Sequence, residues 1–288
     1  MATLKAIRKR ISSVRNTQQI TKAMKMVSAA KLRRAQEAAV AARPYAEKMT
    51  ELLKNVAARV SSAAHPLLQP REEKKILLVL FTSDRGLCGG YNANLVRGAE
   101  AFMRTQGAGK EVELVLVGRK GADYFRRRRA AIVERYIGIL ATPADELAVE
   151  IGQKLIARFI NGDVDAVYIL YSQFRSALSQ VPTLEKLLPV ALTGTSEQEA
   201  EQLTEYLYEP GVEQLLASLL PRLTQVAMQR ALLEATASEH GARMTAMDSA
   251  TSNASKMIGT LTLQMNRARQ ASITRELMEI VGTAEALK

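Results

Sequence analysis

The sequence predicts an α/β protein, with a Rossmann-like, largely parallel sheet domain and a long antiparallel coiled coil formed by the N- and C-terminal helices. Three observations support this fold class. Residues 222–288 contain no proline and only three glycines, and their apolar and small residues recur at alternating spacings of three and four. That spacing is the narrow stripe of a coiled coil. The N-terminal residues repeat it, whereas the middle of the chain alternates strand-like apolar runs with helical stretches.

The first predicted element is a helix with one apolar stripe. Its opening residues, spaced by three or four, are Leu4, Ile7, Ile11 and Val14. After a phase shift we expect the stripe to resume at Ile20, Met24 and Val27. The first proline of the chain is Pro44, so nothing before it interrupts a helix.

A matching stripe runs along the last predicted helix. Its members are Met244, Met247, Thr251, Ala254, Ile258, Leu261, Met265 and Ala268. Two of every seven residues are too few for a helix that packs on a globular core, so each terminal helix needs a partner helix. We therefore predict one hairpin-like shaft built from opposite ends of the chain.

The middle of the chain predicts a sheet covered on both faces. Continuous apolar runs are typical of strands buried on both faces, and helices between them favour parallel pairing. The expected strands are residues 76–82, 112–117 and 165–171, with further edge strands at 181–190 and 206–208, and the expected helices lie near 94–104, 119–129 and 145–161. The predicted domains are an N-terminal shaft helix over 1–64, an α/β body over 70–208 and a C-terminal shaft helix over 210–288, bent at Pro221.

The net charge of +11 is concentrated at one end of the chain. Residues 1–43 hold eleven Lys and Arg against one acid, Glu37, so the first helix carries nearly all of the excess. A basic helix of this kind binds nucleic-acid phosphates, lies on an anionic membrane, sits inside an acidic protein sleeve, or simply presents a solvated face.

Composition excludes several classes of protein. No apolar run is long enough to span a membrane, and the first residues lack the apolar segment of a signal peptide. A single cysteine, Cys88, excludes a disulfide framework and indicates a reducing compartment, and two histidines with one thiol exclude an ordinary zinc site. We expect no catalytic residues, no metal and no cofactor.

One glycine-rich loop tests the hypothesis of a nucleotide-binding enzyme. Residues 86–90, Gly-Leu-Cys-Gly-Gly, follow a predicted strand and precede a helix, where a phosphate loop would lie. The loop lacks the spacing of a dinucleotide-binding motif and the Lys and Ser/Thr of a Walker A motif. A structural turn is the favoured interpretation, as a solvated face is for the four arginines at 126–129.

Three blocks of sequence together resemble the gamma subunit of the F-type ATP synthase, in its bacterial form. They are Ile20-Thr-Lys-Ala-Met-Lys-Met-Val27, Thr82-Ser-Asp-Arg-Gly-Leu-Cys-Gly-Gly90 and Arg267-Ala-Arg-Gln-Ala-Ser-Ile-Thr274 with the Glu276-Leu and Glu279-Ile-Val that follow. Smaller blocks between them occur in the same order, so the resemblance covers essentially the whole chain. The chloroplast form carries a regulatory cysteine pair in an insertion, and this chain has neither.

The resemblance implies a rotor without chemistry of its own. Its coiled coil would enter a ring of three alpha and three beta subunits, and its body would contact the epsilon subunit and the membrane-embedded c-ring. The beta-subunit contacts implied by the matching motifs are Lys22, Met24, Lys25, Arg269, Gln270, Thr274 and Glu279, and the c-ring contacts are Tyr206, Tyr208 and Glu209. The implied location is peripheral, on the cytoplasmic face of the bacterial cell membrane, with no nucleic-acid partner.

A second hypothesis follows from charge alone, namely a basic coiled coil that binds nucleic acid or acts as a scaffold. Its signature would be a salt-dependent affinity for duplex DNA. Copurification with alpha and beta subunits distinguishes the rotor hypothesis from it.

Overall fold

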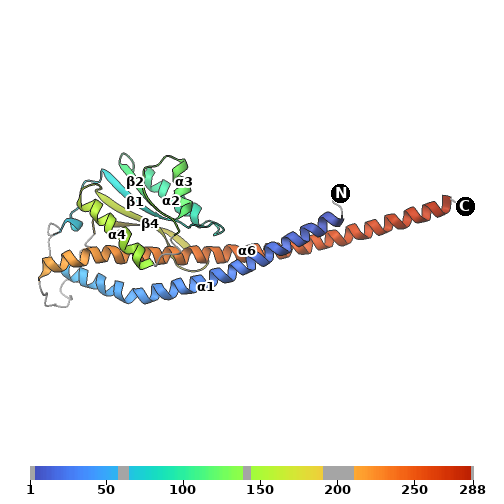
Figure 1. Cartoon of the computed structure of the whole chain (residues 1–288), viewed down its shortest axis with the longest axis horizontal. Coiled ribbons are helices and arrows are strands. Elements are labelled where there is room, and N and C mark those ends of the chain that lie inside the picture. The colour runs from blue at the N-terminus through green and yellow to red at the C-terminus, as the bar shows by residue number, and fades with distance from the viewer. Residues whose placement is uncertain (1–3, 58–64, 139–143, 191–210, 287–288) are drawn as a thin grey trace. The chain divides into compact units, whose positions relative to one another are not determined.

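The computed structural model describes residues 4–57, 65–138, 144–190 and 211–286 (Figure 1). It forms two compact units, one of residues up to 28 together with those from 243 onward, and one of residues 29–242. Two long helices, α1 (Leu4–Ala57) and α6 (Val212–Ala286), contribute to both units. None of the helices in the described ranges is long and apolar enough to cross a membrane.

The unit of residues 29–242 contains a five-stranded sheet in the order β3-β2-β1-β4-β5. Its strands are β1 (Lys75–Phe81), β2 (Glu111–Val117), β3 (Ile132–Tyr136), β4 (Ala166–Phe174) and β5 (Gln180–Leu188). The first four are mutually parallel, and β5 pairs antiparallel with β4 at one edge. The prediction of a largely parallel sheet is confirmed.

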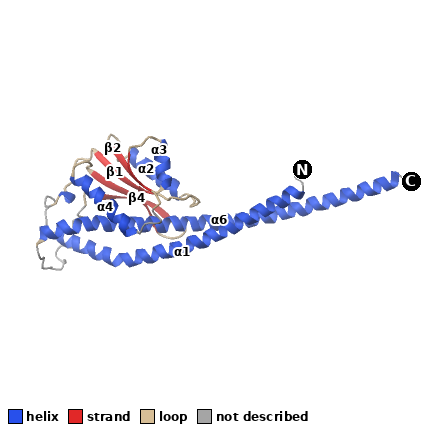
Figure 2. Ribbon diagram, in the orientation of Figure 1, coloured by secondary structure: helices blue, strands red, loops and turns tan. Residues whose placement is uncertain are grey.

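Helices cover both faces of this sheet (Figure 1 and Figure 2). The helices between strands are α2 (Tyr91–Arg104), α3 (Arg119–Arg127) and α4 (Ala144–Ile160), and a short 3-10 helix, η2 (Pro66–Leu68), precedes β1. Helices α2 and α3 pack on one face, whereas α4 and the first part of α6 pack on the other. The expected bend at Pro221 does not end the helix, since α6 continues through it.

The sheet has a hydrophobic core on each of its two faces. Successive residues of a central strand point alternately into one core and the other. Leu77 and Val79 of β1 pack with α4 and α6, while Leu78 and Leu80 pack with α2 and α3. Side chains alternate between the faces of a strand, so a run that is apolar at every position is buried on both. This explains why all residues of β1 after Lys75 are buried.

Strand β3 was not among the expected strands. It has five residues at the open edge of the sheet, and its burial alternates between partial and exposed. An edge strand meets a neighbour on one side only, so it does not require the continuous apolar run that marks β1 and β2. Residues 206–208, a second expected edge strand, lie outside the described residues.

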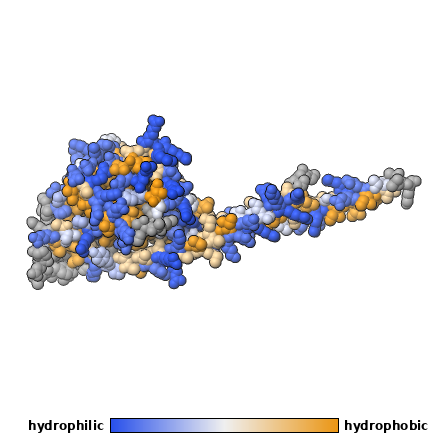
Figure 3. Space-filling view, in the orientation of Figure 1, coloured by the Kyte–Doolittle hydropathy of each residue, from blue (hydrophilic) through white to orange (hydrophobic). Residues whose placement is uncertain are grey.

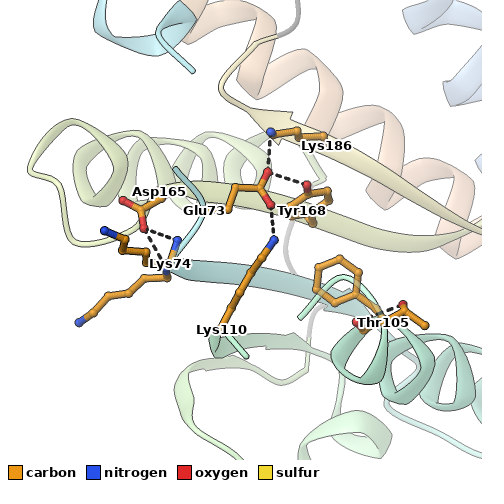
Figure 4. A network of polar contacts seen from close by, with 9 residues as sticks. Glu73, Lys74, Thr105, Lys110, Asp165, Tyr168 and Lys186 are labelled. Carbon is orange, nitrogen blue, oxygen red and sulfur yellow. Dashed lines mark hydrogen bonds and ion pairs between the residues drawn. The ribbon is translucent and has the colours of Figure 1, made fainter. Parts of the chain in front are cut away.

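A charged cluster closes the end of the sheet where the parallel strands begin (Figure 4). The Glu73 carboxylate accepts hydrogen bonds from Lys110 Nζ at 2.9 Å, Lys186 Nζ at 2.7 Å and the Tyr168 hydroxyl at 2.9 Å. Partial burial alone would raise the pKa of Glu73, but the hydrogen bonds from Lys186, Lys110 and Tyr168 outweigh it and lower the pKa to about 2. Nearby, Asp165 accepts bonds from the backbone N–H groups of Lys74 and Lys75.

We expect Glu73→Gln to lower the free energy of unfolding of the body by about 1–2 kcal/mol at neutral pH, because it removes charge-assisted hydrogen bonds. The folded-state pKa lies below the ordinary 4.5. The stabilisation by the carboxylate is therefore present above pH 4.5 and lost as the pH falls toward 2. Denaturant unfolding of both proteins should give a difference that shrinks across that range; a difference independent of pH would contradict this.

Candidate functional site: the paired ends of the terminal helices

The unit of residues up to 28 and from 243 is an antiparallel pair of helices with an apolar seam. Ile7 and Ile11 of α1 are buried against Leu261 of α6. Val14 of α1 and Ile258, Met265 and Ala268 of α6 are partly buried around them. The predicted coiled-coil stripe of α6 is confirmed, as is the first part of the stripe of α1.

From Gln18 onward along α1, the seam becomes polar. Three pairs join the helices: Gln18 Nε2 donates to Ser255 Oγ at 2.5 Å, the hydroxyls of Thr21 and Thr251 lie 2.7 Å apart, and Lys25 Nζ lies 2.5 Å from Asp248 Oδ1. A slide by one turn would break these pairs, and it would place Gln18 opposite Ile258 or Lys25 opposite Met244. Polar pairs in a coiled-coil seam specify register at some loss of stability.

The predicted phase shift of the α1 stripe is wrong. Ile20 and Val27 are 59% and 58% exposed, whereas Thr21 and Ser28 are buried. The buried positions of α1 keep the original spacing of three and four, but polar residues such as Thr21 and Ser28 occupy them. The apolar side chains of Ile20 and Val27 point outward instead. Met26, at 64% exposure, adds to this outward apolar face.

Helix α6 continues past the N-terminal end of α1 (Figure 1). The register set by Ile11 and Leu261 would place Leu4 opposite Ala268, so residues from 269 onward lie beyond the paired part. This segment exposes apolar side chains, visible near the C-terminus in Figure 3. They are Ile273, Leu277, Met278, Ile280 and Val281, each about half exposed or more.

The predicted beta-subunit contacts fall into two groups within this unit. Lys22 is exposed on α1, and Met24 and Lys25 are partly buried beside it, with Lys25 held by Asp248. The second group lies on the unpaired segment of α6 and is exposed throughout: Arg269, Gln270, Thr274 and Glu279. At 1.5 Å per residue, Arg269 lies roughly 30 Å along α6 from Asp248, so the structure does not bring the groups together.

The predicted c-ring contacts Tyr206, Tyr208 and Glu209 lie outside the described residues. The outward apolar residues of α1 are not among the contacts predicted from the sequence. The break in apolar spacing after Val14 is the sequence signal that marks them.

Residues 82–84, just before the glycine-rich loop, bond to the start of α3. Asp84 accepts bonds from the N–H groups of Arg119 and Gly138, each at 3.0 Å. The Lys120 N–H donates to the Ser83 carbonyl at 3.0 Å, and the Gly121 N–H donates to Thr82 Oγ1 at 2.9 Å. The glycine-rich loop of residues 86–90 itself leads into α2, where the Tyr91 N–H donates to the Cys88 carbonyl at 3.2 Å.

Close packing at this edge also leaves no space at Gly118. Its φ is +98°, and a Cβ there would lie 2.1 Å from the Thr82 carbonyl oxygen. Only glycine fits this position without a shift of the backbone. The structural-turn interpretation of residues 86–90 stays a prediction.

The chain thus combines a doubly wound α/β unit with an antiparallel helix pair, and its two terminal helices contribute to both units. The sequence model of the family described as ATP synthase matches residues 3–287. The chain is 52% identical over 289 residues to the ATP synthase gamma chain of Geobacter metallireducens and 50% identical over 288 residues to that of Moorella thermoacetica, with each chain fully covered. The chain belongs to the ATP synthase gamma chain family.

Solved structures agree in fold. The central stalk and c-ring structure of the Tetrahymena thermophila mitochondrial ATP synthase contains a chain with 28% identity and a TM-score of 0.61, covering 80% of this chain and 99% of that one. A chain of the Euglena gracilis mitochondrial ATP synthase aligns with a TM-score of 0.69 at 19% identity, covering 99% of this chain and 94% of that one. The hypothesis of a nucleic-acid-binding coiled coil finds no such support.

Proposed function

We propose that this chain is the central-stalk rotor of a bacterial ATP synthase, coupling rotation of a membrane-embedded c-ring to ATP synthesis in a ring of alpha and beta subunits. The chain itself would be non-catalytic. It would also contact an epsilon subunit and lie peripherally on the cytoplasmic face of the cell membrane. Its membership of the gamma chain family supports the assignment.

The observation that carries the proposal is a helix pair whose seam is already filled and which still exposes apolar side chains. Leu261 is buried between the helices, but Ile20 and Val27 face outward. Exposed apolar stripes of this kind indicate contact with another macromolecule. A slender helix pair fits inside a protein ring, and the basic first helix suits a ring that presents carboxylates.

Energetics require an extended contact surface. Three chemically identical sites adopt different states only if an asymmetric partner imposes the difference. Moving one site from 1:99 to 99:1 between two states requires roughly 5.5 kcal/mol of differential binding. Exposed ion pairs contribute at most about 1 kcal/mol each, so apolar contacts along α1 and α6 must act together with the charged groups.

The direct test is rotation. The chain would be coexpressed with alpha and beta subunits of its own enzyme, and Ala108→Cys, at an exposed site on the body, would hold a visible probe. We expect copurification with both subunits and ATP-driven stepwise rotation of the probe. The isolated chain should hydrolyse no ATP. A chain that purifies without alpha and beta subunits, or that hydrolyses ATP alone, would contradict the proposal.

A further inference from the structure

One face of the body carries a dense group of cations, none of which is among the predicted subunit contacts. Eight exposed Lys and Arg side chains lie on α2, α3 and the turn after α3, and we name this surface the α2–α3 basic face. They are Arg97, Arg104, Arg119, Lys120, Arg126, Arg127, Arg128 and Arg129. Figure 3 shows hydrophilic side chains gathered over the part of the body where Figure 1 places α3.

Helical spacing and packing bring these cations to one surface. Arg97 and Arg104 are seven residues apart on α2, as are Lys120 and Arg127 on α3, and such residues share a side of their helix. Both helices pack on the same face of the sheet. Arg128 joins them, because its guanidinium lies 3.4 Å from Glu100 of α2.

Most of the charge on this face has no carboxylate partner among the residues that the structure describes. Of the eight cations, Arg126 and Arg128 have such partners there, Asp123 and Glu100, at 3.5 and 3.4 Å. Arg97 bonds to the neutral amide of Asn94. The remaining cations form no ion pair within the described ranges of the chain: Arg104, Arg119, Lys120, Arg127 and Arg129. Exposed, unpaired guanidinium groups suit phosphates, which they bind in a bidentate manner.

We propose that the α2–α3 basic face binds an anionic phospholipid surface. No large apolar side chain is exposed anywhere on residues 91–127, all of which the structure describes. The fully buried centre of a protein interface is more apolar than the rest of the surface, and this face offers no such centre. Lipid headgroups move laterally and fit an irregular array of cations, and clusters of about four to eight Lys and Arg beside a membrane span or on an amphipathic helix bind anionic leaflets.

The inference rests on the proposed function in one respect, because a central stalk above a c-ring works beside a membrane. Binding would be electrostatic and without insertion. It should therefore weaken as salt is added, since exposed charges are screened.

The test uses F1 particles assembled with the full chain and vesicles of phosphatidylcholine, alone or mixed with phosphatidylglycerol. The variant combines Arg104→Gln, Arg127→Gln and Arg129→Gln. The control combines Lys74→Gln, Lys75→Gln and Arg175→Gln, which removes the same charge from exposed positions elsewhere on the body. We expect cosedimentation with the mixed vesicles only, reduced about tenfold or more by the variant and little by the control.

Equal losses in the two triple variants, or no binding to mixed vesicles, would overturn the proposal. So would tighter binding of duplex DNA than of vesicles, if only the α2–α3 variant lost it, because nucleic acid would then be the partner. Recovery of intact particles from every variant keeps this test separate from the rotor assignment. Failure of the particles to form from the unaltered chain would instead count against the proposed function.

Discussion

Leu261→Asp is expected to abolish ATP-driven ion pumping while the α/β body stays folded. Leu261 is buried against Ile7 and Ile11 in the seam between the helices. Truncating a buried leucine costs about 2–5 kcal/mol, and an unpaired carboxylate in its place costs several more. The apolar cluster is small, so the helices should separate in this region. Hydrogen exchange of residues 4–28 measures that separation, and pumping by reconstituted enzyme measures its consequence.

Leu263→Asp is the matched control. Leu263 lies two residues further along the same helix and is 63% exposed, so the same change of side chain leaves the seam intact. In the isolated chain we expect residues 4–28 to keep their protection in this variant and to lose it in Leu261→Asp. Equal protection in the two variants would show that the seam is not where the structure places it.

Arg269→Glu should lower ATP synthesis about tenfold or more, without changing the stability of the isolated chain. Arg269 is exposed on the unpaired segment of α6 and forms no ion pair within the described residues. If it contacts a carboxylate-bearing loop of a beta subunit, charge reversal turns an attraction into a repulsion. Losing one partner of such a contact costs about 2–5 kcal/mol, which approaches the energy needed to switch a site.

Arg127→Glu supplies the comparison for that measurement. Arg127 is also exposed and forms no ion pair with the described residues, but it lies on the body at the end of α3. ATP synthesis and pumping measured side by side should fall for Arg269→Glu only. If both variants keep full activity, the contact residues implied by the family do not apply to this chain.

The sequence predicted the sheet well because the inner strands are buried on both faces. Each residue of β1 from Ile76 to Phe81 is apolar. A short, continuous apolar run of this kind is typical of a strand that is buried on both faces. Strand β3 was missed because an edge strand with Glu134 and Arg135 carries no such signal. The antiparallel pairing of β5 depends on the turn that precedes it. The pattern of apolar residues does not predict the direction in which that turn sends the chain.

The seam shows why the candidate site was only partly predictable. Periodicity identifies apolar residues but not the partner that buries them. Ile20 and Val27 were assigned to the seam because they are apolar, yet Thr21 and Ser28 occupy it. Apolar side chains that contact another subunit have the same pattern in sequence as those that pack within the chain. The contacts at Lys22, Met24 and Gln270 stay predictions for the same reason.

The bonds formed by Thr82 and Asp84 have a consequence for how the sheet carries a mechanical load. Thr82 Oγ1 accepts the Gly121 amide, and Asp84 accepts the amides of Arg119 and Gly138, so the end of β1 is bonded to the segments that follow β2 and β3. Three neighbouring parallel strands are therefore cross-linked where they end. A force applied to one of them would be shared by the other two instead of shearing the strands apart.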